Sequence, residues 1–218
     1  MVRRLSVVYC AMCWFASLVS PNLALGTGTF DAGREDWTAD GGTLVHVATG
    51  GNPGGFLQLT DETSSNMFLT APQNEFYSGD LSGYVNGFVQ FDARLVGLAS
   101  AATPFTTFGT IRFSNGVHSA SFDLAPLGEP TDQWTTYVAM LTSPPWATDL
   151  EAWLAILSNV TSLTVNLESH SPIVETVGFD NFRLRGLPEP TTLALAIGGT
   201  GAAVLVRRGR RRGLAQFR

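Results

Sequence analysis

Hydrophobic and polar residues alternate along much of the chain with a period of two. In the segment 88–95 every second residue is apolar, and the residues between them are mostly polar. The same alternation occurs in 110–114 and 162–168, and again in 179–184. A period of two is typical of β-strands that bury one face and expose the other. We therefore predict half-buried strands in these segments.

Turns rich in glycine and proline separate the strands, which number about ten at this spacing. Turn signals stand at 50–55, 115–116 and 126–130. The Asn-Gly pair at 115–116 favours a type I′ hairpin, in which both central residues have positive φ. The pattern predicts an all-β fold, an antiparallel β-sandwich, and within that class a jelly roll. Further strand candidates are 43–48, 56–60, 67–71, 117–124, 134–141 and 173–177.

One segment, 149–157, has the period of a helix. Four of its apolar residues are spaced i, i+3, i+4 and i+7, which places them on one side of a helix. We predict a short amphipathic helix that is capped by Thr148 or Asp149 and closes one end of the sandwich. Its tryptophan is expected to pack in the core rather than on a ligand. The four residues are Leu150, Trp153, Leu154 and Leu157.

The N-terminal end has the order of a secretory signal peptide. An arginine pair precedes an apolar run over 5–19, and a Ser-Pro pair ends that run. Small residues then lead to Gly26, where we place the cleavage. Residues 1–25 are therefore predicted to be a signal peptide, with a buried N-terminal helix as the alternative.

The C-terminal end has three parts in order. Pro188, Glu189 and Pro190 come first, an uncharged apolar block follows over 191–206, and an arginine cluster comes last. As a helix the block is roughly 24 Å long, slightly short of a bilayer core of about 30 Å. Because arginines stay on the cytoplasmic side, the preceding domain is expected outside. The cluster consists of Arg207, Arg208, Arg210, Arg211 and Arg212.

These three parts, in this order, resemble the PEP-CTERM sorting signal of Gram-negative bacteria. The resemblance covers 187–218 and implies that an exosortase, a membrane cysteine protease, processes the tail near the Pro-Glu-Pro motif. It also implies a link to exopolysaccharide and the biofilm matrix. The protein would be inner-membrane anchored before processing, and at the cell surface or extracellular afterwards. A plain C-terminal membrane anchor is the alternative.

Charge is distributed unevenly along the chain. All 13 basic residues are arginines. Between Gly26 and Leu187, 17 acidic residues outnumber five arginines, which gives this part a net charge of −12. Such a surface repels nucleic acid, so no nucleic-acid partner is predicted. Cys10 and Cys13 both lie in the predicted signal peptide, so the processed protein would have no disulfide and no cysteine metal ligand.

Short glycine-rich motifs follow one another between Phe30 and Leu184, among them the segments 51–56, 71–72 and 79–82. Their order resembles the laminin B domain, also called laminin IV type A. The resemblance implies a jelly-roll sandwich over 26–186, related to carbohydrate-binding modules. It supplies no catalytic residues. The chain departs from laminin in lacking cysteines and flanking EGF-like repeats, so laminin-type partners are not implied.

A structural calcium ion is one expectation that this resemblance brings, since jelly-roll carbohydrate-binding modules often hold one between their first and last strands. Asp31 lies in the first strand region, and Asp180 and Asn181 lie in the last. Carboxylate and amide oxygens are the ligands that Ca²⁺ prefers. The alternative is that these residues are ordinary surface and turn residues.

Sugar contact is the other expectation, because aromatic rings stack on the faces of sugars. The candidate ligand residues are Trp37, Tyr84 and Trp134. Large aromatic residues also dominate protein cores, so core packing is the alternative for each of them.

We find no sequence motif for catalysis. A nucleophile elbow, a zinc-protease helix and a phosphate loop are all missing, and the three histidines have no metal-ligand spacing. The two carboxylates of a glycosidase are defined by the distance between them in the folded protein, so the sequence does not reveal whether such a pair is present. We predict an exported, non-catalytic protein that serves adhesion or glycan contact. A structural matrix component without a specific ligand and a glycan hydrolase remain the alternatives.

Overall fold

The computed structural model describes residues 26–61, 66–98, 103–104, 108–142, 146, 149–171 and 174–186. The predicted signal peptide and the predicted sorting tail lie outside these residues. Within them, no helix is long and apolar enough to cross a membrane.

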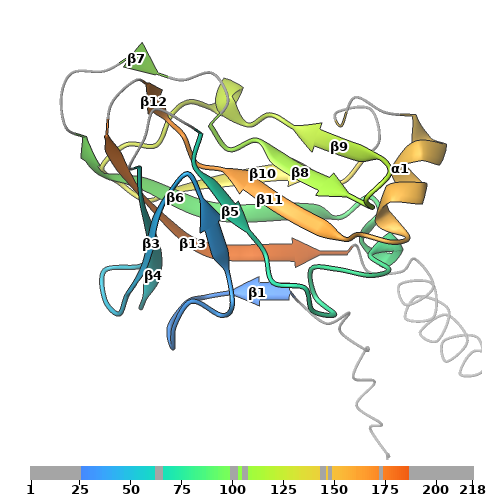
Figure 1. Cartoon of the computed structure of the whole chain (residues 1–218), viewed down its shortest axis with the longest axis horizontal. Helices are drawn as coiled ribbons and strands as arrows, with labels where there is room; N and C mark the ends of the chain where they lie inside the picture. The colour runs from blue at the N-terminus through green and yellow to red at the C-terminus, as the bar shows by residue number, and fades with distance from the viewer. Residues whose placement is uncertain are drawn as a thin grey trace, which may run out of the picture.

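Two antiparallel sheets form the domain, as the alternation predicts (Figure 1). Sheet A has the strand order β10-β6-β13-β4-β3, and β1 pairs with the far end of β13. The central strands β6 and β13 are long because alternating apolar residues continue through both of them. The strands are β1 (Gly26–Gly28), β3 (Gly42–Val47), β4 (Phe56–Asp61), β6 (Phe88–Leu98), β10 (Thr135–Met140) and β13 (Glu175–Arg185).

Sheet B has the strand order β2-β5-β11-β8-β9. Its strands are β2 (Thr38–Asp40), β5 (Phe68–Thr70), β8 (Ile111–Ser114), β9 (Ser119–Phe122) and β11 (Ser162–Asn166). A separate pair, β7 (Thr103–Pro104) and β12 (His170–Ser171), lies at one end of the sandwich, and helix α1 (Leu150–Leu157) lies at the other (Figure 1). Two short 3₁₀ turns, η1 (Ser82–Tyr84) and η2 (Ala125–Leu127), connect strands.

The core lies between the two sheets. Alternate residues of β6, namely Val89, Phe91 and Ala93, are buried, as the alternation predicts. On sheet B, Leu163 and Val165 of β11 are buried in the same way. Because successive side chains of a strand point to opposite faces, the residues between these positions form the outer surface of each sheet. A ligand that binds to a sheet face would therefore contact these outward-facing residues.

The predicted helix is present, but its buried face differs from the predicted stripe. Trp153, Ile156 and Leu157 are buried, whereas Leu150 is 55% exposed and Leu154 is 39% exposed. The reason is the packing of Trp153, whose ring stacks on Trp146 at 5.0 Å and so fixes the rotation of the helix. Asp149 is the N-cap, and its side chain accepts a 2.8 Å hydrogen bond from the Ala152 N–H.

The predicted hairpin between β8 and β9 is also present, with a shifted turn. Gly116 has φ of +85°, and Asn115 is absent from the residues with positive φ. The Asn115 N–H donates to the His118 carbonyl oxygen at 3.0 Å. The central residues are therefore Gly116 and Val117, with glycine first, as in type II′ turns rather than type I′.

Candidate functional site

Polar side chains in register form a row across the outer face of sheet B. Thr70 on β5 is paired with Thr38 on β2 and with Thr164 on β11. Thr164 is also paired with Arg112 on β8, which in turn is paired with Ser121 on β9. The row exists because buried Leu69, Ile111 and Val165 alternate with these positions along the same strands.

A second row lies beside the first. Asp40 on β2 is opposite Phe68 on β5, and Phe68 is opposite Asn166 on β11. Phe68 is partly buried, whereas Asp40 is exposed and Asn166 is buried. An aromatic ring therefore stands beside the row of hydroxyl groups.

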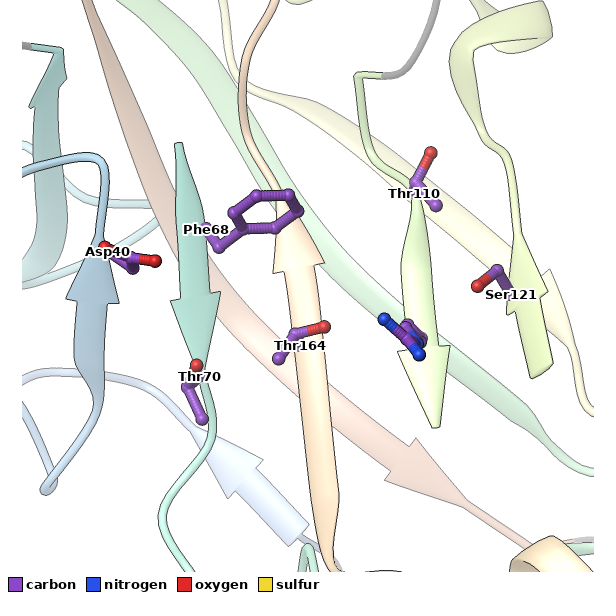
Figure 2. Close-up of a pocket in the computed structure, with 7 residues that line it drawn as sticks. Asp40, Phe68, Thr70, Thr110, Ser121 and Thr164 are labelled. Carbon is purple, nitrogen blue, oxygen red and sulfur yellow. The ribbon is translucent and has the colours of Figure 1, made fainter. Parts of the chain in front are cut away.

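The two rows border a hollow of about 270 Å³. Figure 2 draws its lining residues as sticks, and the Phe68 side chain extends from β5 towards β11. This volume lies just below the range of roughly 300–1,000 Å³ that is typical of small-molecule sites. The lining residues are Asp40, Phe68, Thr70, Thr110, Arg112, Ser121 and Thr164.

The lining combines one ring with groups that donate and accept hydrogen bonds. The threonine and serine hydroxyls can do both, Asp40 accepts, and Arg112 donates. Arg112 uses its Nη2 to donate a 2.9 Å hydrogen bond to the Ser119 hydroxyl. No ion pair between Arg112 and a carboxylate is found among the described residues. The hollow thus suits a hydroxyl-rich ligand with an apolar face.

The structure corrects two of the predicted ligand residues. Trp37 is 1% exposed and Tyr84 is 6% exposed, so both belong to the core. The Trp37 ring lies 5.0 Å from the Phe182 ring and 5.4 Å from the Phe179 ring, and these contacts cover its faces. Burial of such large apolar rings outweighs any use as a binding surface.

Trp134, the third predicted ligand residue, is partly exposed on the outer face of sheet A, away from the hollow. The Arg94 guanidinium lies 4.8 Å from its ring centre, and the Phe56 ring meets it edge-on at 5.4 Å. Its indole N–H donates to the Gly50 carbonyl oxygen at 3.1 Å. Arg94 and Phe56 therefore already pack against the Trp134 ring, and the hydrogen bond from its indole N–H holds the 50–55 loop in place.

Sequence reasoning did not place Phe68, Asp40 or Arg112 in a glycan site. The signal was weak because β2 and β5 have only three residues each. In strands that short, alternation shows which side chains point outward but not which strands are neighbours. The hollow is a product of strand order, which the sequence does not display.

The predicted calcium residues do come together, around the 50–55 loop. The Asp180 carboxylate accepts from the Asn52 N–H at 2.6 Å and from the Asn181 N–H at 2.7 Å. Asp31 accepts from the Gly55 N–H at 3.3 Å. Asn181 donates from Nδ2 to the Asp92 carboxylate at 2.9 Å and to the Asn52 carbonyl oxygen.

These contacts make a hydrogen-bonded clamp on the loop. Burial raises the pKa of Asp180 to about 6, and the charges of Asp92 and Asp31 add to this, although two N–H donors act against it. N–H groups of Asn52, Asn181 and Gly55 already hydrogen-bond the carboxylate oxygens that would have to bind a cation. The described residues include no group of three or more acidic, histidine or cysteine side chains that could hold a metal. The side chains in this arrangement do not fit a calcium ion, and calcium stays a prediction from sequence.

A second buried polar cluster lies near β12. The Ser169 hydroxyl donates to the Glu175 carboxylate at 2.5 Å, and it lies 2.8 Å from His170 Nδ1. The same ring nitrogen lies 3.2 Å from Glu175. A catalytic triad needs the serine and the acid on different ring nitrogens, and an accessible serine. Ser169 is fully buried, so the cluster is structural.

No family model matches the chain, and none of the curated proteins compared with it matches. Among solved structures, an exo-β-agarase has a TM-score of 0.50 at 19% identity over 74% of this chain, which spans about a quarter (24%) of that enzyme. The L4b domain of human laminin alpha-2 has a TM-score of 0.48 at 12% identity, over 60% of this chain and 80% of that one. A family 30 carbohydrate-binding module of a cellulosomal cellulase from Clostridium thermocellum has a TM-score of 0.46 at 18% identity, over 73% and 90%.

What is shared is the fold alone. At 19% identity and a TM-score of 0.50, the likeness to part of the exo-β-agarase shows a shared fold and no activity. The chemistry of this chain has to be argued from its own residues.

Proposed function

We propose that the protein is a non-catalytic, jelly-roll glycan-binding module whose site is the hollow on the outer face of sheet B. The observation that carries the proposal is the lining itself. It places one aromatic ring, Phe68, beside a row of hydroxyl groups that lie in register on neighbouring strands.

Sugars match this lining chemically. A pyranose ring has an apolar face that an aromatic ring can cover, and a rim of hydroxyls that pair with hydroxyl, carboxylate and guanidinium groups. The strands fix the positions of Thr70 and Thr164, because each is held between hydrogen-bonded neighbours. A preformed polar surface of this kind costs little entropy to occupy.

The number and burial of the carboxylates support the proposal that the protein is non-catalytic. Glycoside hydrolysis generally uses two of them on opposite sides of the scissile bond. Among the residues that the structure describes, Asp40 is the single carboxylate that lines the hollow. Asp92 and Asp180 do lie opposite each other on β6 and β13, but both are buried under Asn52.

The cellular setting is proposed from the sequence. The signal peptide over 1–25 and the PEP-CTERM tail over 187–218 support export, processing by an exosortase, and a final place at the cell surface or in the extracellular matrix. A glycan-binding module would there meet extracellular polysaccharide. We infer that the part between Gly26 and Leu187, which we call the body, contacts this polysaccharide after the tail has been processed.

The direct test is affinity for soluble polysaccharides, measured by affinity electrophoresis or calorimetry. Phe68→Ala is expected to weaken binding about tenfold, since a lost ring contact of about 1.4 kcal/mol corresponds to that factor. Phe88→Ala is the matched control, because Phe88 is a partly buried phenylalanine on the outer face of sheet A. Equal losses in both variants, or no binding by the wild-type protein to any polysaccharide, would contradict the proposal.

A further inference from the structure

The hollow on sheet B has opposite charges at its two ends. Asp40 lies on β2 at one edge of the sheet, and Arg112 lies on β8 on the far side of β5 and β11. Three strand spacings separate them, or roughly 14 Å across the sheet. Thr70 and Thr164 occupy the strands between. A ligand that reaches both ends is therefore longer than one sugar ring.

Arg112 is available for an anion. Its side chain is exposed, and the hydrogen bond to Ser119 holds only one of its five N–H donors. No carboxylate of the described residues forms an ion pair with it. The other four described arginines form no ion pair with a described carboxylate either, so what distinguishes Arg112 is its exposed place in the hollow. Arg94, by comparison, is covered by the rings of Phe56 and Trp134.

We propose that the hollow selects an oligosaccharide that carries one acidic sugar, with its anionic group on Arg112 and a neutral sugar towards Asp40. This inference rests on the proposed glycan-binding function and specifies its ligand. A planar guanidinium with free N–H donors binds a carboxylate or a sulfate ester through two parallel hydrogen bonds. Asp40 accepts hydrogen bonds from neutral hydroxyls and repels a second anion.

The net negative charge of the body also disfavours glycans that carry many negative charges. A glycan with a negative charge on every sugar would place a charge near Asp40, and it would also meet the net charge of −12 of the rest of the body. A glycan with a single anionic sugar gains the contact with Arg112, places no charge near Asp40 and meets less of the general repulsion. The ligand class is therefore a sparsely acidic glycan rather than a uniform polyanion.

The experiment compares four disaccharides on the purified protein by calorimetry. They are a glucose disaccharide, a glucuronic acid–glucose disaccharide, a disaccharide of two uronic acids, and a glucose disaccharide with one sulfate ester. We expect either singly charged disaccharide to bind roughly three- to tenfold more tightly than the neutral one, and more tightly than the doubly charged one. The ratio between the carboxylate and the sulfate ester identifies the natural anion.

Substitutions of Arg112 test whether this residue causes the preference for a charged sugar. Arg112→Gln is expected to abolish the preference for the charged sugar, measured as the ratio of the affinities for the charged and the neutral disaccharide, and Arg112→Lys to keep part of it. Arg34→Gln is the control, because Arg34 is also exposed but does not line the hollow. Unchanged melting temperatures show that the variants are folded.

The outcomes separate the two proposals. If neutral and singly charged disaccharides bind equally, or if Arg112→Gln leaves the preference intact, the acidic-sugar inference is wrong and glycan binding stands. If none of the disaccharides and no polysaccharide binds, both proposals fail together.

Discussion

Glu168 lies in the interior with a carboxylate oxygen that has no hydrogen-bond partner among the described residues, and this makes stability depend on pH. The side chain is 1% exposed. Burial raises its pKa to about 8, and the charges of Glu175 and Asp61 act in the same direction. The carboxyl is therefore protonated in the folded protein at pH values where it is ionised in the unfolded chain.

The sign follows from proton counting. Between the ordinary pKa of 4.5 and the folded value of about 8, the folded state holds one more proton at this site. The free energy of unfolding then falls by about 1.4 kcal/mol for each pH unit gained. From pH 5.5 to 7.5 the loss amounts to roughly 3 kcal/mol, a large part of the stability of an ordinary domain.

Glu168→Gln removes this titration and keeps the shape of the side chain. We expect the difference in unfolding free energy between variant and wild type to move in favour of the variant by about 1.4 kcal/mol per pH unit over this range. The slope is the readout, because a buried amide adds a constant offset that does not depend on pH. Glu129, whose pKa burial raises to about 7, contributes equally to both proteins.

The assay is urea unfolding at pH 5.5, 6.5 and 7.5. Glu151→Gln, on the exposed surface of α1, is the matched control and leaves the slope unchanged. Parallel curves for Glu168→Gln and the wild type across this range would refute the reasoning, because they would mean that Glu168 titrates alike in the folded and unfolded chains.

Three further predictions follow from the loop clamp and the two ends of the chain. Gly54→Ala should destabilise the protein by more than Gly79→Ala in a thermal melt; both glycines have φ near +85°, which costs alanine about 1 kcal/mol or more, but only at Gly54 would the added Cβ lie 1.8 Å from the Asp31 carboxylate. The calcium prediction from sequence requires a lower melting temperature in the presence of a chelator, whereas the hydrogen-bonded arrangement of Asp31, Asp180 and Asn181 predicts no change. The sorting prediction expects processing near Pro188 and recovery of the body outside the cell, whereas an intact chain in the cytosol contradicts it.

Much of the sandwich could be predicted from alternation, because burying one face of a strand requires apolar residues at every second position. β6, β8 and β11 were found in this way, and their inward residues are buried as expected. The helix was also predictable, but its rotation was not. Leu150 and Leu154 match the helical period as well as Ile156 does, and the stacking of Trp153 on Trp146 decides which of them is buried.

The site was much harder to predict than the strands. Trp37 was predicted to contact a sugar because it is a large aromatic residue, but the same large apolar surface favours burial, and it lies in the core. Phe68 and Arg112 are 44 positions apart in sequence and become neighbours of one hollow only because β11 lies between β5 and β8. That order depends on long-range pairing, which no local pattern encodes.

The most direct measurement is to locate a bound oligosaccharide on an isotopically labelled sample by following amide chemical shifts during a titration. If the hollow is the binding site, the largest shifts cluster on Phe68, Thr70, Arg112 and Thr164 and saturate together. Shifts that gather around Trp134 on sheet A instead, or that stay absent at saturating sugar, contradict a glycan site on sheet B.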